Sequence, residues 1–290
     1  MKEGLVMEKI ALIFDSTVYL SQEVLEKNKV NVVSLNVIEG NETYKETEID
    51  NDFVFERINK KIKLTTSQPS PSEFLDVYEK CLKEGYTDLI VLTLSKELSG
   101  TYQSALLAKN MLSTPKAVHL LDTNNAAYGN ELLGLRLIEL VDAKKPVQEI
   151  LKQMEVYIKN SYLMFTVENL FFLQKGGRLS TAQALLGTVL RVKPVIKMIE
   201  GKLKLYHKER THKKLYDFFV KEMKNDPNYG PDKKVYVRII TRDAEDSAKA
   251  LEEAILSEFK HAEIEITPNL GPVFSIHVGP KGFGYTWIFE

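Results

Sequence analysis

Residues 9–17, Lys-Ile-Ala-Leu-Ile-Phe-Asp-Ser-Thr, contain the pattern that decides the fold. A short apolar run at 9–14 is followed at once by Asp15, Ser16 and Thr17. Uninterrupted apolar runs of this length are typical of parallel strands buried on both faces, with the polar residues in the loop at the carboxyl end of the strand. The stretch therefore predicts the first strand of a parallel α/β sheet.

The chain up to residue 142 repeats this alternation of strand and helix. We predict further strands at 30–37, 88–94 and 117–121, and helices that begin near 21 and 71 and span 100–112 and 125–142. Residues 39–42, Glu-Gly-Asn-Glu, predict the turn of a short hairpin that projects from the second strand. A strict β-α order predicts an α/β fold with a doubly wound parallel sheet and ligand groups at the carboxyl ends of its strands. We assign this sheet to an N-terminal domain, 8–160, and residues 1–7 to a disordered extension.

The second half of the chain has a different rhythm. Its apolar segments predict an antiparallel hairpin at 194–206, helices at 146–159, 168–174, 179–190, 211–223 and 244–258, and strands near 234–241, 262–267, 273–278 and 284–289. We therefore expect a C-terminal α+β domain, 161–290, with a mixed or antiparallel sheet.

Composition excludes several classes of protein. The 290 residues carry a formal net charge of −1, so nothing in the overall charge favours nucleic acid as a partner. The single cysteine, Cys81, excludes an internal disulfide, and we expect it to be a buried structural thiol. The sequence has neither a signal peptide pattern nor an apolar run long enough to span a membrane, which predicts a soluble, cytoplasmic protein.

Motifs for nucleotides and metals are missing. The chain has no G-x-x-x-x-G-K-[ST], and Gly176-Gly177-Arg178 is too incomplete for a dinucleotide fingerprint. The spacing of His207 and His212 does not place them on one face of a helix, so we predict no metal site and no cofactor.

Three short polar stretches predict an anion-binding site. They are Thr65-Thr66-Ser67-Gln68-Pro69-Ser70-Pro71, Leu98-Ser99-Gly100-Thr101-Tyr102-Gln103-Ser104 and His277-Val278-Gly279-Pro280. Each is predicted to lie in a loop where a regular element begins or ends, so its hydroxyl, imidazole and backbone N–H groups are available to an anion. The residues themselves leave open a carboxylate, a phosphate or a catalytic pair as the purpose of the site.

Two other interpretations compete with simple binding. Ser99 and His277 could act as nucleophile and base of a small-molecule hydrolase or phosphotransfer enzyme, although no G-x-S-x-G elbow is present. Between Lys175 and Lys214 the chain has eleven Lys and Arg residues against two acids, which suggests a surface for an acidic partner or an anionic membrane. A regulatory protein that uses this surface without a ligand is the third hypothesis.

Taken together, the polar stretches, Asp15-Ser16-Thr17, Gln174-Lys175-Gly176-Gly177-Arg178-Leu179-Ser180 and Lys193-Pro194 resemble the DegV family. The resemblance extends from residue 8 to the C-terminus, with the motifs in order. It implies one DegV-like unit over 8–290 that binds a long-chain fatty acid between its two domains. By matching position, the carboxylate would be held by Thr66 and Ser99, with Ser67 and Gly100 beside them, and His277 would complete the network.

The resemblance also implies a partner. In bacterial fatty acid kinase systems such a protein presents its fatty acid to a separate kinase subunit, which makes the acyl phosphate for phospholipid synthesis, so this chain would be a carrier with no catalytic residue. Arg210 matches a family arginine associated with docking the kinase. Apolar residues that flank Gly176-Gly177 are our candidates for the wall of the acyl tunnel, namely Phe165, Phe171, Leu186 and Leu190.

Overall fold

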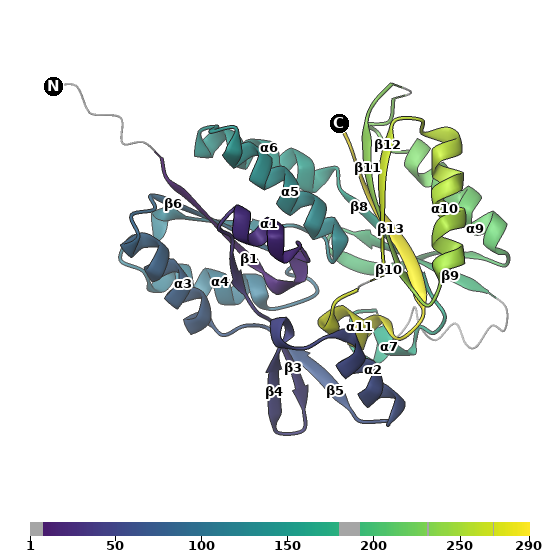
Figure 1. Cartoon of the computed structure of the whole chain (residues 1–290), viewed down its shortest axis with the longest axis horizontal. Helices are drawn as coiled ribbons and strands as arrows, with labels where there is room; N and C mark the ends of the chain where they lie inside the picture. The colour runs from purple at the N-terminus through teal and green to yellow at the C-terminus, as the bar shows by residue number, and fades with distance from the viewer. Residues whose placement is uncertain (1–7, 180–191, 231, 269) are drawn as a thin grey trace.

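A computed structural model describes residues 8–179, 192–230, 232–268 and 270–290 (Figure 1). The predicted extension at 1–7 lies outside these residues. The first part of the chain forms a four-stranded parallel sheet with the order β2-β1-β6-β7. Its strands are β1 (Ile10–Asp15), β2 (Asn31–Val33), β6 (Asp88–Thr93) and β7 (Val118–Asp122). The parallel sheet predicted from the apolar run at 9–14 is therefore confirmed.

Helices cover both faces of this sheet because successive side chains of a buried strand point to opposite sides. Ala11 and Ile13 pack with α3 (Pro71–Lys83) and α4 (Thr101–Met111), whereas Leu12 and Phe14 pack with the helices of the other face. Those helices are α1 (Gln22–Lys27), α5 (Tyr128–Asp142) and α6 (Val147–Lys159). The sheet is thus doubly wound, as predicted. Cys81 of α3 is fully buried in the first of these layers, and burial raises the pKa of its thiol.

The short hairpin predicted around the turn at 39–42 is confirmed, but it belongs to a small antiparallel sheet whose third strand was not predicted. This sheet has the order β4-β3-β5 and projects together with α2 (Asn51–Asn59) at the bottom of Figure 1. Its strands are β3 (Asn36–Glu39), β4 (Glu42–Lys45) and β5 (Leu64–Ser67). The single strand predicted at 30–37 is therefore wrong. The chain leaves the parallel sheet at Ser34, since the N–H of Leu35 donates to the hydroxyl of Ser16 and not to a neighbouring strand.

A six-stranded mixed sheet forms most of the second half of the molecule. Its order is β10-β9-β8-β13-β11-β12, and only the β11–β12 pair is parallel. The strands are β8 (Tyr162–Val167), β9 (Lys193–Ile199), β10 (Lys202–Glu209), β11 (Val235–Arg242), β12 (Ala262–Thr267) and β13 (Gly282–Phe289). One face is covered by α9 (His212–Lys224) and α10 (Glu245–Glu258). This arrangement confirms the predicted mixed α+β organisation.

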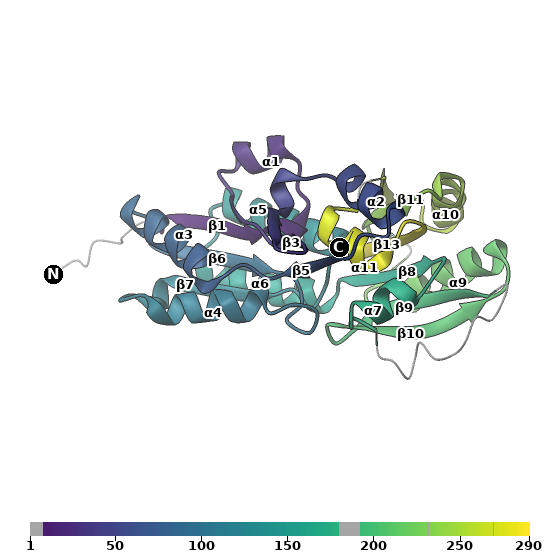
Figure 2. The same ribbon diagram turned by 90° about the horizontal axis from the view of Figure 1, so that it is seen from below.

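The other face of the mixed sheet turns toward the parallel sheet. Figure 2 shows the two sheets along the long axis of the molecule, with α11 (Pro272–Val278) near the centre. Helix α5 contacts β11 and β13 as well as β1, and α11 contacts α2 and β5. The division into domains at residue 160 consequently stays a prediction, because elements from both halves pack between the sheets.

Residues 273–278 form a helix, which corrects the strand predicted there. Periodicity alone does not distinguish a short buried strand from a short buried helix. Pro272 begins the helix, where its missing N–H costs nothing, and the N–H of Val273 donates to Glu46 at 3.1 Å. His277 therefore lies in the last turn of α11 and not at the end of a strand. The short α7 (Phe171–Lys175) begins three residues after the predicted start at 168, and the helix predicted at 179–190 falls almost entirely outside the described residues.

Candidate functional site

The centre of the site is a hydrogen bond between two residues that are far apart in the sequence. Thr66 Oγ1 on β5 lies 2.8 Å from His277 Nε2 on α11. Thr66 is therefore part of a strand and not of the predicted loop, yet β5 is the edge strand of its sheet and its side chains remain available. His277 is only 9% exposed. The two elements thus hold a hydroxyl against a buried imidazole.

The imidazole of His277 is neutral at physiological pH. Burial, and secondarily the charge of Arg178, lowers its pKa to about 4. Nδ1 has no hydrogen-bond partner among the described residues, and a proton there would be a buried donor without an acceptor, close to a cation. We therefore assign the proton to Nε2, which donates it to Thr66. The hydroxyl proton of Thr66 is then free to reach a ligand.

Close packing holds the imidazole in place. A Cβ on Gly176 would lie 2.3 Å from His277 Nδ1, so only glycine leaves room for the ring. Gly279, which follows α11, has φ +88°, and a Cβ there would lie 2.6 Å from the ring of Phe172. Gly176 is therefore required by its neighbour, and Gly279 by both its backbone conformation and its neighbour.

Ser99 lies at the carboxyl end of the parallel sheet, in the loop between β6 and α4. Its Oγ lies 2.9 Å from Thr101 Oγ1 and accepts a hydrogen bond from the N–H of Thr101 at 3.3 Å. Gly100 directly precedes α4 and lies against the side-chain amide of Gln68. The structure places Ser99 in one pocket with Thr66, Ser67 and His277, and Gly100 is not part of its wall. We call it the polar pocket because it carries these groups, although leucines, Val273, Phe274 and Val278 also line it.

Arg178 is a member of this site that the sequence reasoning missed. Its Nε donates to the carbonyl oxygen of Leu98 at 3.2 Å, and its Nη1 donates to the carbonyl oxygen of Gly176. These bonds fasten the turn after α7 to the loop that carries Ser99. Burial lowers the pKa of the guanidinium, which has no acidic partner among the described residues. Its position directly after Gly176-Gly177 could have identified it as a site residue. We counted it only among the basic residues between Lys175 and Lys214.

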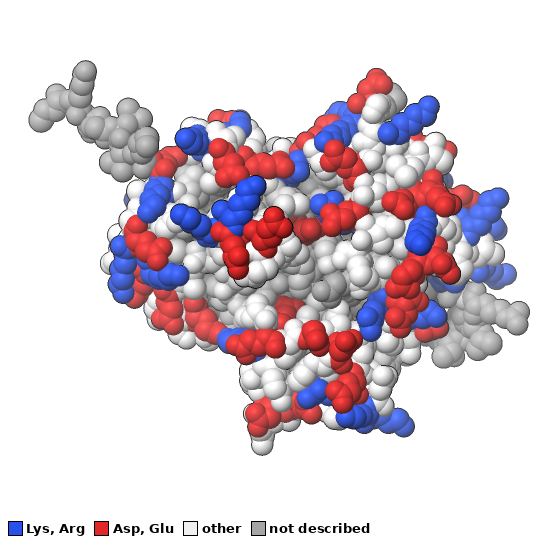
Figure 3. All heavy atoms as spheres, viewed as in Figure 1, with Lys and Arg blue, Asp and Glu red and all other residues white. Residues whose placement is uncertain are grey.

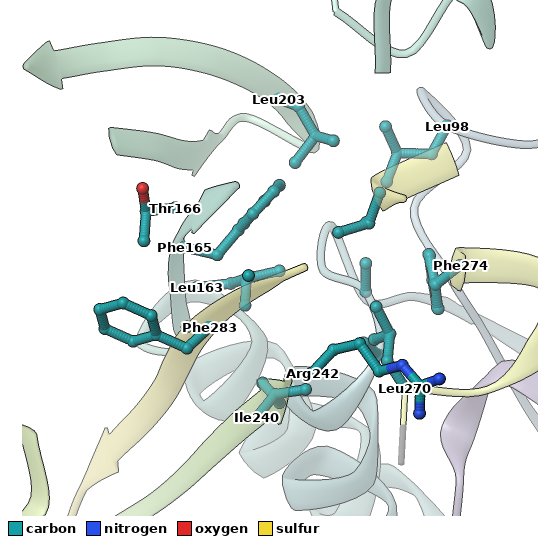
Figure 4. A pocket seen from close by; sticks show the side chains of 15 residues that line it. Leu98, Leu163, Phe165, Thr166, Leu203, Ile240, Arg242, Leu270, Phe274 and Phe283 are labelled. Atoms are coloured by element: carbon teal, nitrogen blue, oxygen red, sulfur yellow. The ribbon is translucent and has the colours of Figure 1, made fainter. Parts of the chain in front are cut away.

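The polar pocket adjoins an apolar cavity between the two sheets. The two share Leu98, Leu203, Phe274 and Val278 in their walls. In Figure 4, Leu98 and Phe274 stand on one side of the cavity and Phe165 and Phe283 on the other. The remaining wall is almost wholly apolar and includes Ala126, Ala127, Leu163, Ile240 and Leu270. An elongated ligand with one anionic end and one apolar body matches this pair of pockets.

The predicted tunnel residues are found in different places. Phe165 on β8 lines the apolar cavity. Phe171 on α7 is 52% exposed and lines an outer cleft on the other side of the polar pocket. Leu186 and Leu190 lie outside the described residues.

Arg210 lies away from the polar pocket, although Arg178 of the same basic segment lines it. Arg210 is exposed and follows the end of β10, seven residues beyond Leu203, which corresponds to roughly 20 Å of extended chain. Several cations of the segment pair within the chain, such as Lys197 with Glu222 at 2.7 Å and Lys202 with Glu97 at 3.1 Å. Charges of both signs are also mixed over the face shown in Figure 3. The excess of basic residues in this segment is thus partly neutralised.

Two further observations concern metal binding and membrane-spanning helices. Within the residues that the structure describes, no cluster of three His, Cys, Asp or Glu side chains is arranged to hold a metal ion. None of the helices in the same ranges has the length and apolar character of a membrane span.

A doubly wound parallel sheet and a mixed sheet, with adjoining polar and apolar pockets between them, define a two-sheet α/β protein. The chain belongs to the DegV family, since the family model, described as an uncharacterised protein family, matches residues 9–290. Protein DegV of Bacillus subtilis is 32% identical over 285 residues, which cover 97% of this chain and 99% of that protein. The resemblance proposed from the motifs is therefore confirmed.

Solved structures of relatives share the fold. A fatty acid-binding DegV family protein from Thermus thermophilus superimposes with a TM-score of 0.87 at 32% identity, covering 97% of this chain and all of that one. DegV from Bacillus subtilis, described as a fatty acid binding protein, has a TM-score of 0.82 at 30% identity over 98% of this chain and 100% of that one. Both relatives thus bind fatty acids.

Proposed function

We propose that this protein binds a long-chain fatty acid, with the carboxylate in the polar pocket and the acyl tail in the apolar cavity. The observation that carries the proposal is that the two pockets adjoin and share four wall residues, with the Thr66–His277 pair at one end. The fatty acids bound by the two relatives support it.

The polar residues have separate roles in this proposal. Thr66 and Ser99 donate hydroxyl protons to the carboxylate, and the neutral His277 orients Thr66 by donating to its oxygen. Arg178 supplies a positive charge beside the pocket, while Ser67 lines it and Gly100 packs behind its wall. Hydrogen bonds to a charged acceptor are worth more than neutral ones, so the polar pocket fixes the orientation of the acid.

The acyl tail supplies most of the affinity. Burial of about sixteen carbons at ~0.8 kcal/mol per CH₂ gives roughly 12 kcal/mol before costs. Association and ordering take back a large part of this, which leaves tight but reversible binding. Reversible binding is what a carrier requires.

The carrier presents its fatty acid to a separate kinase subunit. The kinase transfers the γ-phosphoryl group of ATP to a carboxylate oxygen, which gives acyl phosphate and ADP, and the acyl phosphate feeds phospholipid synthesis in the cytoplasm. Arg210 is our candidate for contact with the kinase, because it is exposed and distant from the pocket. Transient contact with an anionic membrane would deliver and collect the acyl chain.

The enzyme hypothesis has less support. A nucleophile and its base need a hydrogen bond between them, and a third group usually orients the base. His277 Nε2 is instead bonded to Thr66, Ser99 Oγ is bonded to Thr101, and His277 Nδ1 has no carboxylate partner among the described residues. These contacts favour binding over catalysis.

Mass spectrometry of an organic extract of the purified protein tests the proposal. We expect about one fatty acid per chain, and delipidated protein should rebind palmitate in titration calorimetry. A delipidated protein that binds no fatty acid of any length would contradict the proposal. Turnover of esters or phosphoesters by the isolated chain, lost in His277→Gln, would favour the enzyme hypothesis.

A further inference from the structure

The wall of the apolar cavity contains a cation. Among the described residues that line the cavity, Arg242 is the only one with a charge, and Thr166 is the only other one with a polar side chain. Arg242 is the last residue of β11 and lies opposite Gly282 of β13. A guanidinium keeps its proton in proteins, so a permanent positive charge borders a space that otherwise suits hydrocarbon.

Arg242 lies at the end of the cavity that is remote from the polar pocket. In Figure 4, Arg242 lies with Ile240 and Leu270 on the side opposite Leu98 and Leu203. Leu98 and Leu203 also line the polar pocket, whereas the other three residues do not. An acid whose carboxylate occupies the polar pocket therefore directs the far part of its chain toward Arg242.

The Nε atom of Arg242 is a buried donor without an acceptor. It has no hydrogen-bond partner among the described residues, although the side chain as a whole is 27% exposed. The carboxylate of the exposed Asp243 lies 4.0 Å from Nε, which is beyond hydrogen-bond distance. The guanidinium also lies over the ring of Phe55, with Cζ 4.1 Å from the ring centroid. This ring attracts the charge and holds the side chain in place, but it does not satisfy Nε.

Arg238 shows how the protein compensates a cation on the same face of the same strand. Residues 238 and 242 are four apart on β11, so their side chains point to the same side of the sheet. Arg238 Nε donates to Glu131 at 2.9 Å, and Glu265 lies 3.2 Å from another nitrogen of the guanidinium. Arg242 has no such pair of buried and exposed carboxylates among the described residues. The missing acceptor thus belongs to the arginine that borders the cavity.

A plain alkyl chain does not supply the acceptor that Arg242 lacks. A buried donor without a partner is costly, and a hydrogen bond from a charged donor is stronger than a neutral one. A hydroxyl oxygen on the far part of the chain would accept such a bond. The same hydroxyl placed against the leucines of the cavity would itself be buried without a partner.

We propose that Arg242 binds an oxygen-bearing group on the far part of the acyl chain, so that the ligands of this protein include fatty acids with a terminal hydroxyl. This inference rests on the proposed fatty acid binding and adds a second polar contact at the opposite end of the ligand. The polar pocket and Arg242 together would fix both ends of such an acid. Plain fatty acids still bind, because the rest of the wall is apolar.

Pairs of plain and ω-hydroxy fatty acids with ten to sixteen carbons test this inference on the delipidated protein. The two acids of a pair differ only in the terminal oxygen, so the ratio of their Kd values, hydroxylated over plain, isolates its effect. In the wild type this ratio should pass through a minimum at the chain length that places the oxygen against Arg242. Arg242→Met keeps an unbranched stem and removes the guanidinium. At the same chain length the ratio should rise about tenfold in this variant, because one hydrogen bond to a charged group is lost.

Lys249→Met is the matched control, because Lys249 is exposed on α10 and does not line the cavity. It removes the same charge, and its ratios should equal those of the wild type. A wild-type ratio without a minimum, or ratios in Arg242→Met that equal the wild-type ratios at every chain length, would overturn the role of Arg242 alone. Failure of the wild type to bind any plain fatty acid would instead overturn the proposed function.

Discussion

The apolar cavity and the polar pocket share a wall but are built in opposite ways. Most of the cavity comes from strands of one sheet, and its wall consists mainly of apolar side chains without a polar partner. The pocket takes Thr66, Ser99, Arg178 and His277 from four separate segments, and each has one required atom. The difference teaches that affinity here is spread over many residues, whereas orientation depends on a few.

Partial filling of the cavity should give the largest effect on binding. Ala126 lines the apolar cavity but not the polar pocket, so Ala126→Leu adds its methyl groups at a distance from Thr66. If the new side chain displaces about three methylenes of palmitate, the loss is about 2.4 kcal/mol, or roughly sixtyfold in affinity. Titration with acids from sixteen down to eight carbons measures it, and the loss should shrink as the acid becomes shorter.

Ala254→Leu is the control for this substitution. Ala254 is half-buried on α10, on the covered face of the mixed sheet, and the variant should bind every acid normally. If Ala126→Leu weakens the binding of all acids by the same factor, the substitution does not act only on the acyl tail. The separate roles assigned to the cavity and the pocket would then be wrong.

Removal of one hydroxyl from the polar pocket should weaken binding by the same factor at every chain length. Thr66→Val keeps the shape of the side chain and its preference for a strand but deletes the donor to the carboxylate. One hydrogen bond to a charged group is worth about 1.5 kcal/mol, so affinity should fall about tenfold for every acid alike. Calorimetry with the same acids measures this loss.

The adjacent Thr65→Val is the matched control, because neighbouring residues of β5 point to opposite faces and Thr65 is exposed. Its affinity should equal that of the wild type. If Thr66→Val also binds normally, the carboxylate is held elsewhere and the assignment of the pocket fails.

The same contrast explains how much could be predicted from the sequence. Continuous apolar runs in regular alternation with helical segments predicted the parallel sheet, because strands buried on both faces are rich in apolar residues. The run at 273–278 predicted a strand wrongly, since Pro272 and the contact of Val273 with Glu46 decide in favour of a helix, and Glu46 is remote in the sequence. Local pattern therefore determined the layers but not the elements packed between them.

The same limit of local sequence pattern applies to the candidate site. Thr66 and His277 are 211 residues apart, and no spacing rule connects them. The polar stretches predicted a common anion site, but only the family resemblance singled out these two residues. Arg178 was missed because a buried guanidinium and a solvated one have the same sequence signature. The cavity wall was largely missed as well, because residues such as Ile240 and Leu270 become neighbours only when the two sheets pack.

The smallest expected effect is a change in the free energy of unfolding with pH. It tests whether His277 is as buried in the folded protein as the structure shows. Burial lowers the pKa of His277 from its ordinary value of 6.5 to about 4. Between these values the unfolded chain binds more protons at this residue than the folded one, so its contribution to stability is complete above pH 6.5 and falls as the pH falls toward 4. From pH 7 to 5.5 the loss is about 1 kcal/mol.

Other buried groups act in the opposite direction, so a wild-type profile alone would mislead. Burial raises the pKa of Asp15 to about 6 and that of Glu131 to about 7, and both therefore stabilise the folded state as the pH falls. The informative quantity is the difference between the wild type and His277→Gln, whose amide keeps a donor for Thr66 without titrating. Urea unfolding of delipidated protein should show that the wild type loses about 1 kcal/mol more than the variant between pH 7 and 5.5. Parallel profiles would mean that water reaches the imidazole, and that the polar pocket is looser than the Thr66–His277 contact implies.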